Sequence, residues 1–186
     1  MTEAMYFDEP VEVPEEQKLV AEGDKKGVKD AQFEINSLTI KVSGPQSKQP
    51  GRSFWQVAAK PIGEHFGKAT IFQTIFLPQK HEYELAQTNA ADVPNNEESR
   101  KAWSDAQRNV REFNYATLAL GIDRSQLAVH SKQGDVEQYL TSLFAAKKGS
   151  VFNAGVYGRM GEGPDGSPRW ENNLRWHNPA KQQRAT

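Results

Sequence analysis

SVFNAGVYGRM (residues 150–160) and RWENNLRWHNP (residues 169–179) flank the turn-rich stretch GEGPDGS (residues 161–167). Each flanking stretch has the length of a β-strand, and the stretch between them contains Asp165-Gly166, a pair that favours tight hairpin turns. The pattern therefore predicts two antiparallel strands joined by a turn, and a β-rich fold that ends in this hairpin.

The predicted hairpin has two chemically different faces, because side chains alternate across a strand. In the first strand, Tyr157 and Arg159 share a face. In the second strand, Trp170 and Trp176 share one face and Arg175 lies on the other. Aromatic rings that stack on unpaired bases and guanidinium groups that bind phosphates are therefore expected within a few ångströms of each other.

Three further strands are predicted before the hairpin. Residues 28–42 form one long strand whose alternation slips near Ser37, which indicates a bulge or a sharp bend. A loop follows over residues 44–52, and the second and third strands cover residues 53–61 and 68–78.

Two helices are predicted between the third strand and the hairpin. Residues 95–122 begin with an asparagine cap, carry apolar residues at spacings of three and four, and end at Gly121. Residues 134–149 show a shorter helix with an apolar face. The fold class expected from this order is mainly β with inserted helices (α+β), an OB-like antiparallel five-stranded barrel with a helical insertion at about residues 96–146.

A single domain over residues 25–179 is expected, since 186 residues are too few for two large domains. An acidic extended arm (residues 1–24) precedes it and a basic tail (residues 180–186) follows it. Eight acidic residues and one lysine give the arm a net charge of −7, whereas residues 147–186 have a net charge of +4. The arm can therefore compete for a cationic surface, or it is an ordinary solvated segment.

Several function classes lack support in the sequence. The absence of cysteine excludes disulfides, thiolate nucleophiles and cysteine-based metal sites. The four histidines show no metal-ligand spacing, and the glycine-rich GRMGEGPDG lacks the Lys-Ser or Lys-Thr of a phosphate-binding loop. No nucleophile elbow of the Gly-x-Ser-x-Gly type is present. We therefore predict no enzymatic activity, no metal and no cofactor.

The chain is expected to be a cytoplasmic protein, in the host cell cytoplasm if a phage encodes it. No apolar run approaches the roughly 20 residues that cross a bilayer. The first residues lack the basic and apolar regions of a secretory signal.

Aromatic and basic residues are interleaved in the predicted strands, and this pattern favours binding of single-stranded nucleic acid. Phe72 and Phe76 share a strand face that we assign to the barrel interior. The candidate base-stacking residues are Trp55, Tyr157 and Trp176. The candidate phosphate ligands are Arg52, Lys60, Lys68, Arg159, Arg169 and Arg175.

The layout resembles that of the OB-fold single-stranded-DNA-binding proteins of bacteriophages, over residues 28–178. The features that carry the resemblance are the Phe54-Trp55 strand, LALGI (residues 118–122), the Gly-x-Val-Phe-x-Ala-x-Val strand (residues 149–156) and the closing strand ENNLRW (residues 171–176). The resemblance implies a protein that protects and presents single strands during DNA replication or recombination, without a cofactor.

The better-known phage pattern has an acidic segment at the C-terminus. In this chain the acidic segment lies at the N-terminal end and the C-terminal residues are basic. We hypothesise that the acidic arm occupies the cationic DNA-binding surface until DNA displaces it. We also expect the arm to contact replication or recombination proteins. Homo-oligomerisation is a further association that stays open.

The alternative function is that of a phage structural or assembly protein, which uses its N-terminal arm to bind a neighbour and does not bind nucleic acid. Such a protein would oligomerise through the arm. A strand-binding protein would instead lose affinity for oligonucleotides as the salt concentration rises.

Overall fold

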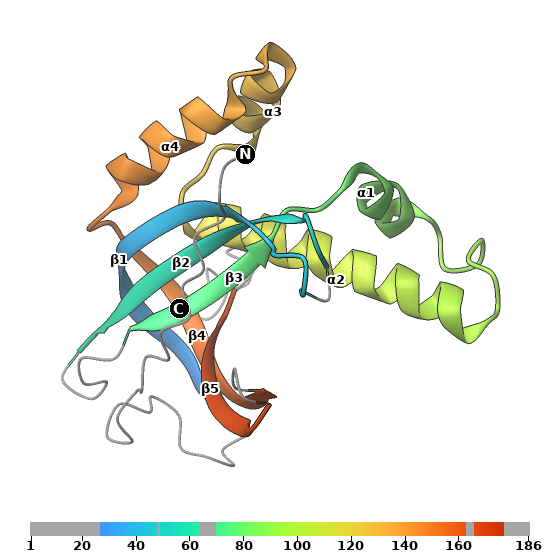
Figure 1. Ribbon diagram of the computed structural model, residues 1–186, viewed down its shortest axis with the longest axis horizontal. Coiled ribbons are helices and arrows are strands. Elements are labelled where there is room, and N and C mark those ends of the chain that lie inside the picture. Colours follow the sequence, from blue (N-terminus) through green and yellow to red (C-terminus); the bar gives the residue numbers. More distant parts are fainter. Residues whose placement is uncertain (1–26, 48, 64–69, 163–165, 177–186) are drawn as a thin grey trace, which may run out of the picture.

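The longest strand, β1 (Val28–Val42), pairs with two different strands along its length (Figure 1). Its first part pairs with β4 (Val151–Glu162), and its second part pairs with β2 (Ser53–Ile62). The register with β2 shifts between Ile35 and Ser37, which confirms the irregularity predicted near Ser37. Because a bulge bends its strand, β1 belongs to both halves of a strongly curved sheet.

The computed structural model describes residues 27–47, 49–63, 70–162 and 166–176. The predicted acidic arm (residues 1–24) and basic tail (residues 180–186) lie outside these residues. The remaining elements in chain order are β3 (Ile71–Phe76), α1 (Lys80–Gln87), α2 (Glu97–Ala119), α3 (Arg124–Gln133), α4 (Val136–Lys147) and β5 (Pro168–Arg175).

The five strands form one antiparallel sheet in the order β3-β2-β1-β4-β5. The two edge strands, β3 and β5, approach each other, and the backbone N–H of Leu174 donates a hydrogen bond of 3.0 Å to Oε1 of Gln73. Among the described residues, no backbone ladder joins these two strands. The predicted α+β class is confirmed, and the barrel is open along one seam, an architecture compatible with the OB fold.

Four helices connect β3 to β4, rather than the two that the sequence predicts. The predicted helices correspond to α2, which has Asn96 as its N-cap, and to α4. The unpredicted helices are α1, which has only eight residues, and α3, which has no buried residue. Neither produces the repeated apolar spacing by which a helix is recognised from sequence.

The indole of Trp55, on β2, joins the sheet to the inserted helices. Its ring centroid lies 5.1 Å from that of Phe113 on α2 and 5.3 Å from that of Phe144 on α4. Trp55 is 1% exposed, and its two ring partners are also buried. The three rings fix α2 and α4 over the interior of the barrel.

A second aromatic cluster fills the part of the barrel between β1, β4 and the end of β5. Phe33 stacks on Phe152, and Phe152 stacks on Trp176, with centroid separations of 5.6 Å in both pairs. All three side chains are buried. The interior of the barrel is therefore a packed core.

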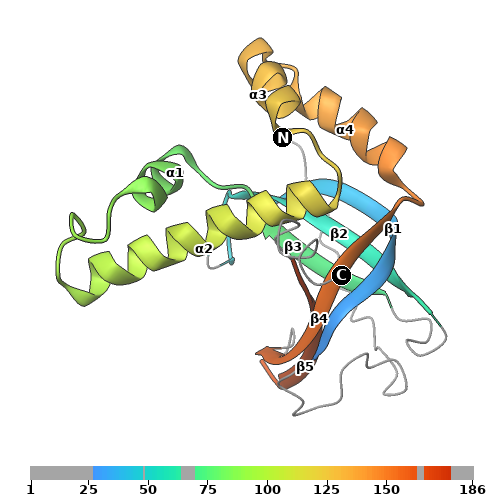
Figure 2. The same cartoon turned by 180° about the vertical axis from the view of Figure 1, so that it is seen from behind.

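The helices α1 and α2 form a projection, which we call the α1–α2 arm. The first half of α2 extends away from the sheet in both views (Figures 1 and 2). A buried ion pair connects the α1–α2 arm to the sheet. The guanidinium of Arg52, directly before β2, lies 2.7 Å from the Glu82 carboxylate of α1. The same carboxylate accepts hydrogen bonds from the Asn109 amide of α2 and from the Gln79 backbone N–H. Buried charges are tolerated where they are paired and hydrogen-bonded, and the Glu82 carboxylate accepts from three donors, so this network sets the position of the α1–α2 arm.

Burial opposes ionisation of Glu82, but the hydrogen bonds from Gln79 and Asn109 and the nearby Arg52 charge together hold its pKa below the ordinary value of 4.5. A carboxyl whose folded-state pKa is lowered stabilises the protein above its unfolded-state pKa. That contribution disappears as the pH falls through the folded-state pKa.

We predict that Glu82→Gln lowers the free energy of unfolding at pH 7 by about 3 kcal/mol or more, because it leaves the Arg52 charge buried without its partner. The difference from the wild type should shrink when unfolding by urea is repeated below pH 4.5. The matched control is Glu84→Gln on the same helix, whose carboxylate forms an exposed ion pair with Lys80. This control should change stability by less than about 0.5 kcal/mol. Equal effects of the two substitutions would contradict a structural role for the buried pair.

Candidate nucleic-acid interface

Three phenylalanine rings lie on the outer face of β2 and β3. Phe54 on β2 and Phe76 on β3 are register partners with ring centroids 5.7 Å apart. Phe72, four residues before Phe76, is 57% exposed. We call these three rings the outer aromatic face.

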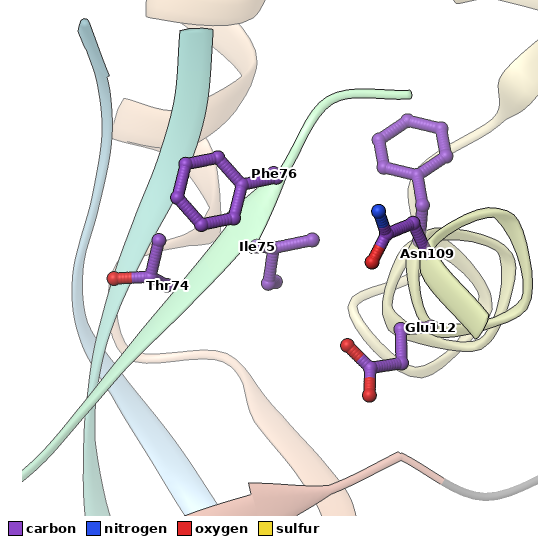
Figure 3. Close-up of a pocket in the computed structure, with 6 residues that line it drawn as sticks. Thr74, Ile75, Phe76, Asn109 and Glu112 are labelled. Atoms are coloured by element: carbon purple, nitrogen blue, oxygen red, sulfur yellow. The ribbon is translucent and has the colours of Figure 1, made fainter. Parts of the chain in front are cut away.

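The position of Phe72 and Phe76 corrects the prediction that they face the barrel interior. The interior positions of β3 are taken by Ile71 and Ile75, which are 3% and 4% exposed. Figure 3 shows Thr74 and Phe76 on one side of β3 and Ile75 on the side of α2. The stretch Ile-Phe-Gln-Thr-Ile-Phe has apolar residues in both alternating phases, so its pattern fits either orientation equally well.

A row of polar side chains crosses the outer face between Phe72 and the Phe54–Phe76 pair. Gln56 on β2 is the register partner of Thr39 on β1 and of Thr74 on β3. Within the described residues, none of the three side chains forms a hydrogen bond. The row therefore presents amide and hydroxyl groups without hydrogen-bond partners between the exposed ring of Phe72 and the half-buried Phe54–Phe76 pair.

Two lysines lie near the ends of this surface. Lys41 is the register partner of Phe54, and Lys60 of Glu34, in the pairing of β1 with β2. Both lysine side chains are exposed. Of the predicted phosphate ligands, Lys60 is the one that the structure places on the same strand as Phe54 and Gln56.

The structure contradicts base stacking by Trp55 and Trp176, two of the three predicted base-stacking residues. Trp55 is 1% exposed and Trp176 is 8% exposed, and each packs against other core rings. A base has no access to either ring in the folded protein. Alternation assigns Trp55 to the core together with Val57, and this places Phe54 outside.

Arg52 is likewise not an exposed phosphate ligand. Besides the ion pair with Glu82, its guanidinium donates to Oε1 of Gln49 at 2.7 Å and to the Leu77 carbonyl at 3.3 Å. The guanidinium carbon also lies 5.0 Å from the centroid of the Phe76 ring. The residue thus supports the outer aromatic face from within the fold.

The β4–β5 hairpin carries a second patch, on its outer side. The guanidinium of Arg175 lies 5.2 Å from the centroid of the Tyr157 ring, and Arg159 forms an ion pair of 3.6 Å with Glu171. Tyr157 is half-buried, whereas Arg159 and Arg175 are exposed. These three predicted residues are therefore brought together, but β1 separates them from β2 and β3 in the sheet.

Trp170 lies on the other side of the hairpin, as the alternation predicts. Its indole covers Gly158, where any side chain would overlap it. Arg169, a predicted phosphate ligand, is half-buried and already interacts with another group of the protein. Lys68, also predicted, lies outside the described residues.

The structure shows a small pocket of about 30 Å³ between β3 and α2, lined by Thr74, Ile75, Phe76, Asn109, Glu112 and Phe113 (Figure 3). This volume holds about one water molecule and is too small for a substrate. In the described part of the chain, no group of three or more His, Cys, Asp or Glu side chains is arranged to hold a metal ion. None of the helices described is long and apolar enough to cross a membrane.

A search of solved structures finds similarity to a chain in the crystal structure of fission yeast Pot1 and Tpz1, with 10% sequence identity and a TM-score of 0.24. The match covers 78% of this chain and 81% of that chain. No protein-family model and no curated protein matches the sequence.

The two kinds of aromatic residue should differ in their effect on stability. We predict that Trp176→Ala lowers the free energy of unfolding by about 3–5 kcal/mol, because it leaves a cavity in the core. Phe72→Ala removes an exposed ring and should change it by no more than about 0.5 kcal/mol. Urea unfolding followed by far-UV circular dichroism measures both. A large loss of stability in Phe72→Ala would show that this ring is part of the core.

Proposed function

We propose that this protein binds single-stranded DNA without a fixed sequence, through the outer aromatic face. The observation that carries the proposal is the exposure of Phe72 beside the Phe54–Phe76 pair. Fully burying a large apolar side chain contributes about 1.5–3 kcal/mol, and Phe72 forgoes part of this gain at 57% exposure, next to two half-buried rings that extend the same apolar surface. A base that stacks on these rings would cover this apolar surface.

The chemistry of the surface favours unpaired bases. Base stacking on an aromatic ring needs the flat side of a base, which a duplex keeps inside its own stack. The exposed Lys60 side chain supplies positive charge for phosphates at the margin of the face. The formal net charge of −1 gives the protein no strong overall attraction for the phosphates of either single or double strands, so base stacking has to supply much of the affinity.

The OB-like sheet supports the same proposal. In OB folds, the face formed by the second and third strands, together with the adjoining loops, binds oligonucleotides. In this chain the corresponding strands are β2 and β3, which carry Phe54, Phe72 and Phe76. The Tyr157, Arg159 and Arg175 patch is proposed as a second contact for the backbone of a longer strand.

The proposal extends to a role in phage DNA replication or recombination, in the host cytoplasm, without catalysis or a cofactor. This extension rests on the layout resemblance described for residues 28–178. The acidic arm is proposed to compete with DNA and to contact replication or recombination proteins.

The test is a titration of a fluorescein-labelled oligo-dT of roughly 16 nucleotides, the upper end of the site size of one OB fold, followed by fluorescence anisotropy. Phe72→Ala should weaken binding by roughly 5- to 150-fold, which corresponds to about 1–3 kcal/mol of stacking on one base. The matched control is Leu118→Ala, which removes an apolar side chain that is 54% exposed on α2. This control should bind as the wild type does.

Two further measurements, at raised salt concentration and with duplex DNA, complete the test. Raising the salt concentration should weaken binding with a slope of about −0.7 per phosphate contacted, and a duplex of equal length should bind more weakly. Unchanged affinity of Phe72→Ala would remove the outer aromatic face from the site. Absence of binding, together with self-association that grows with protein concentration, would favour the assembly protein.

A further inference from the structure

We infer that Gln56 reads the edge of one base and gives the proposed strand binding a preference among bases. The inference rests on the proposed function, because it concerns the same outer aromatic face. Its basis is the position of the free polar row between two separate stacking stations.

The first station is the Phe54–Phe76 pair, whose ring centroids lie 5.7 Å apart, and the second is Phe72. Phe72 and Phe76 are four residues apart on β3 and share its outer side. A strand advances by about 3.3 Å per residue, so their Cα atoms are separated by about 13 Å.

This separation determines how a strand lies on the surface. Neighbouring bases in a stacked strand are only about 3.4 Å apart, so the two stations cannot hold neighbouring bases of a stacked strand. The two stations therefore hold bases that are not neighbours, and at least one base lies over the space between the stations. That space contains the polar row of Thr39, Gln56 and Thr74.

Gln56 is the central member of the row and is half-buried between two exposed threonines. Its amide offers both donors and an acceptor, the combination needed for two simultaneous hydrogen bonds with a base edge. Glutamine pairs in this way with N6 and N7 of adenine. An unpaired base exposes this edge, so the expected preference is for adenine.

Gln73 shows what a glutamine of this sheet does when it has a structural role. Its amide accepts a hydrogen bond from the Leu174 N–H and donates one to the Thr74 carbonyl. The Gln56 amide has no such partner among the described residues. Its hydrogen-bonding groups are therefore available to a ligand.

The experiment compares the dissociation constants of wild type and Gln56→Ala for dA, dC and dT homopolymers of equal length. In a homopolymer every register places the same base over the polar row, so uncertainty in register does not affect the result. The two stations are identical in both proteins, so differences in stacking cancel in the ratio of the variant to the wild type. Gln126→Ala on the exposed surface of α3 is the matched control.

We expect the ratio to be largest for dA, where the loss of a paired amide should weaken binding by roughly 5- to 150-fold. For at least one other homopolymer the ratio should lie close to one, and circular dichroism should show the variant to be folded. An equal ratio for all three homopolymers would overturn the inference and leave the proposed function intact. Failure of the wild type to bind any of them would instead overturn the proposed function.

Discussion

The packing of Trp55 against Phe113 and Phe144 is the interaction on which the rest of the structure depends. The five-stranded sheet is not closed by a ladder between β3 and β5, and the indole brings one helix from each half of the insertion onto its interior. Among the described residues, the indole N–H makes no hydrogen bond, so the contact is held by packing alone. Removing a buried tryptophan of this kind typically destabilises a protein by about 3–5 kcal/mol.

This constraint also determines which rings remain outside. Once Trp55 faces the core, alternation directs Phe54 to the opposite side of β2, and the pairing of β2 with β3 then places Phe76 beside it. The outer position of these two half-buried rings thus results from the same alternation that places Trp55 in the core. Arg52 connects the outer aromatic face to α1, because its guanidinium contacts both Phe76 and Glu82.

The order of strands, the bulge near Ser37 and the two longer helices could be predicted from sequence, since each leaves a local signal in apolar spacing or turn residues. Which aromatic rings face the core and which face outward could not be predicted from local sequence. Trp55 and Trp176 adjoin polar residues and resemble surface residues, yet both occupy core positions. In β3 the two apolar phases are equivalent in sequence, and only the pairing with β2 distinguishes them. The ion pair of Arg52 and Glu82 joins residues thirty positions apart, so local sequence patterns could not predict it.

The seam between β3 and β5 gives the barrel a line of weakness. Neighbouring strands elsewhere in the sheet are held by ladders whose hydrogen bonds must break together, whereas the described bond across the seam is a single one, from Leu174 to Gln73. Local unfolding follows the boundaries with the fewest shared contacts. Sub-global opening of this barrel should therefore begin by separating the β4–β5 hairpin from β3, while β1, β2 and the Trp55 cluster persist as the slowest-exchanging unit.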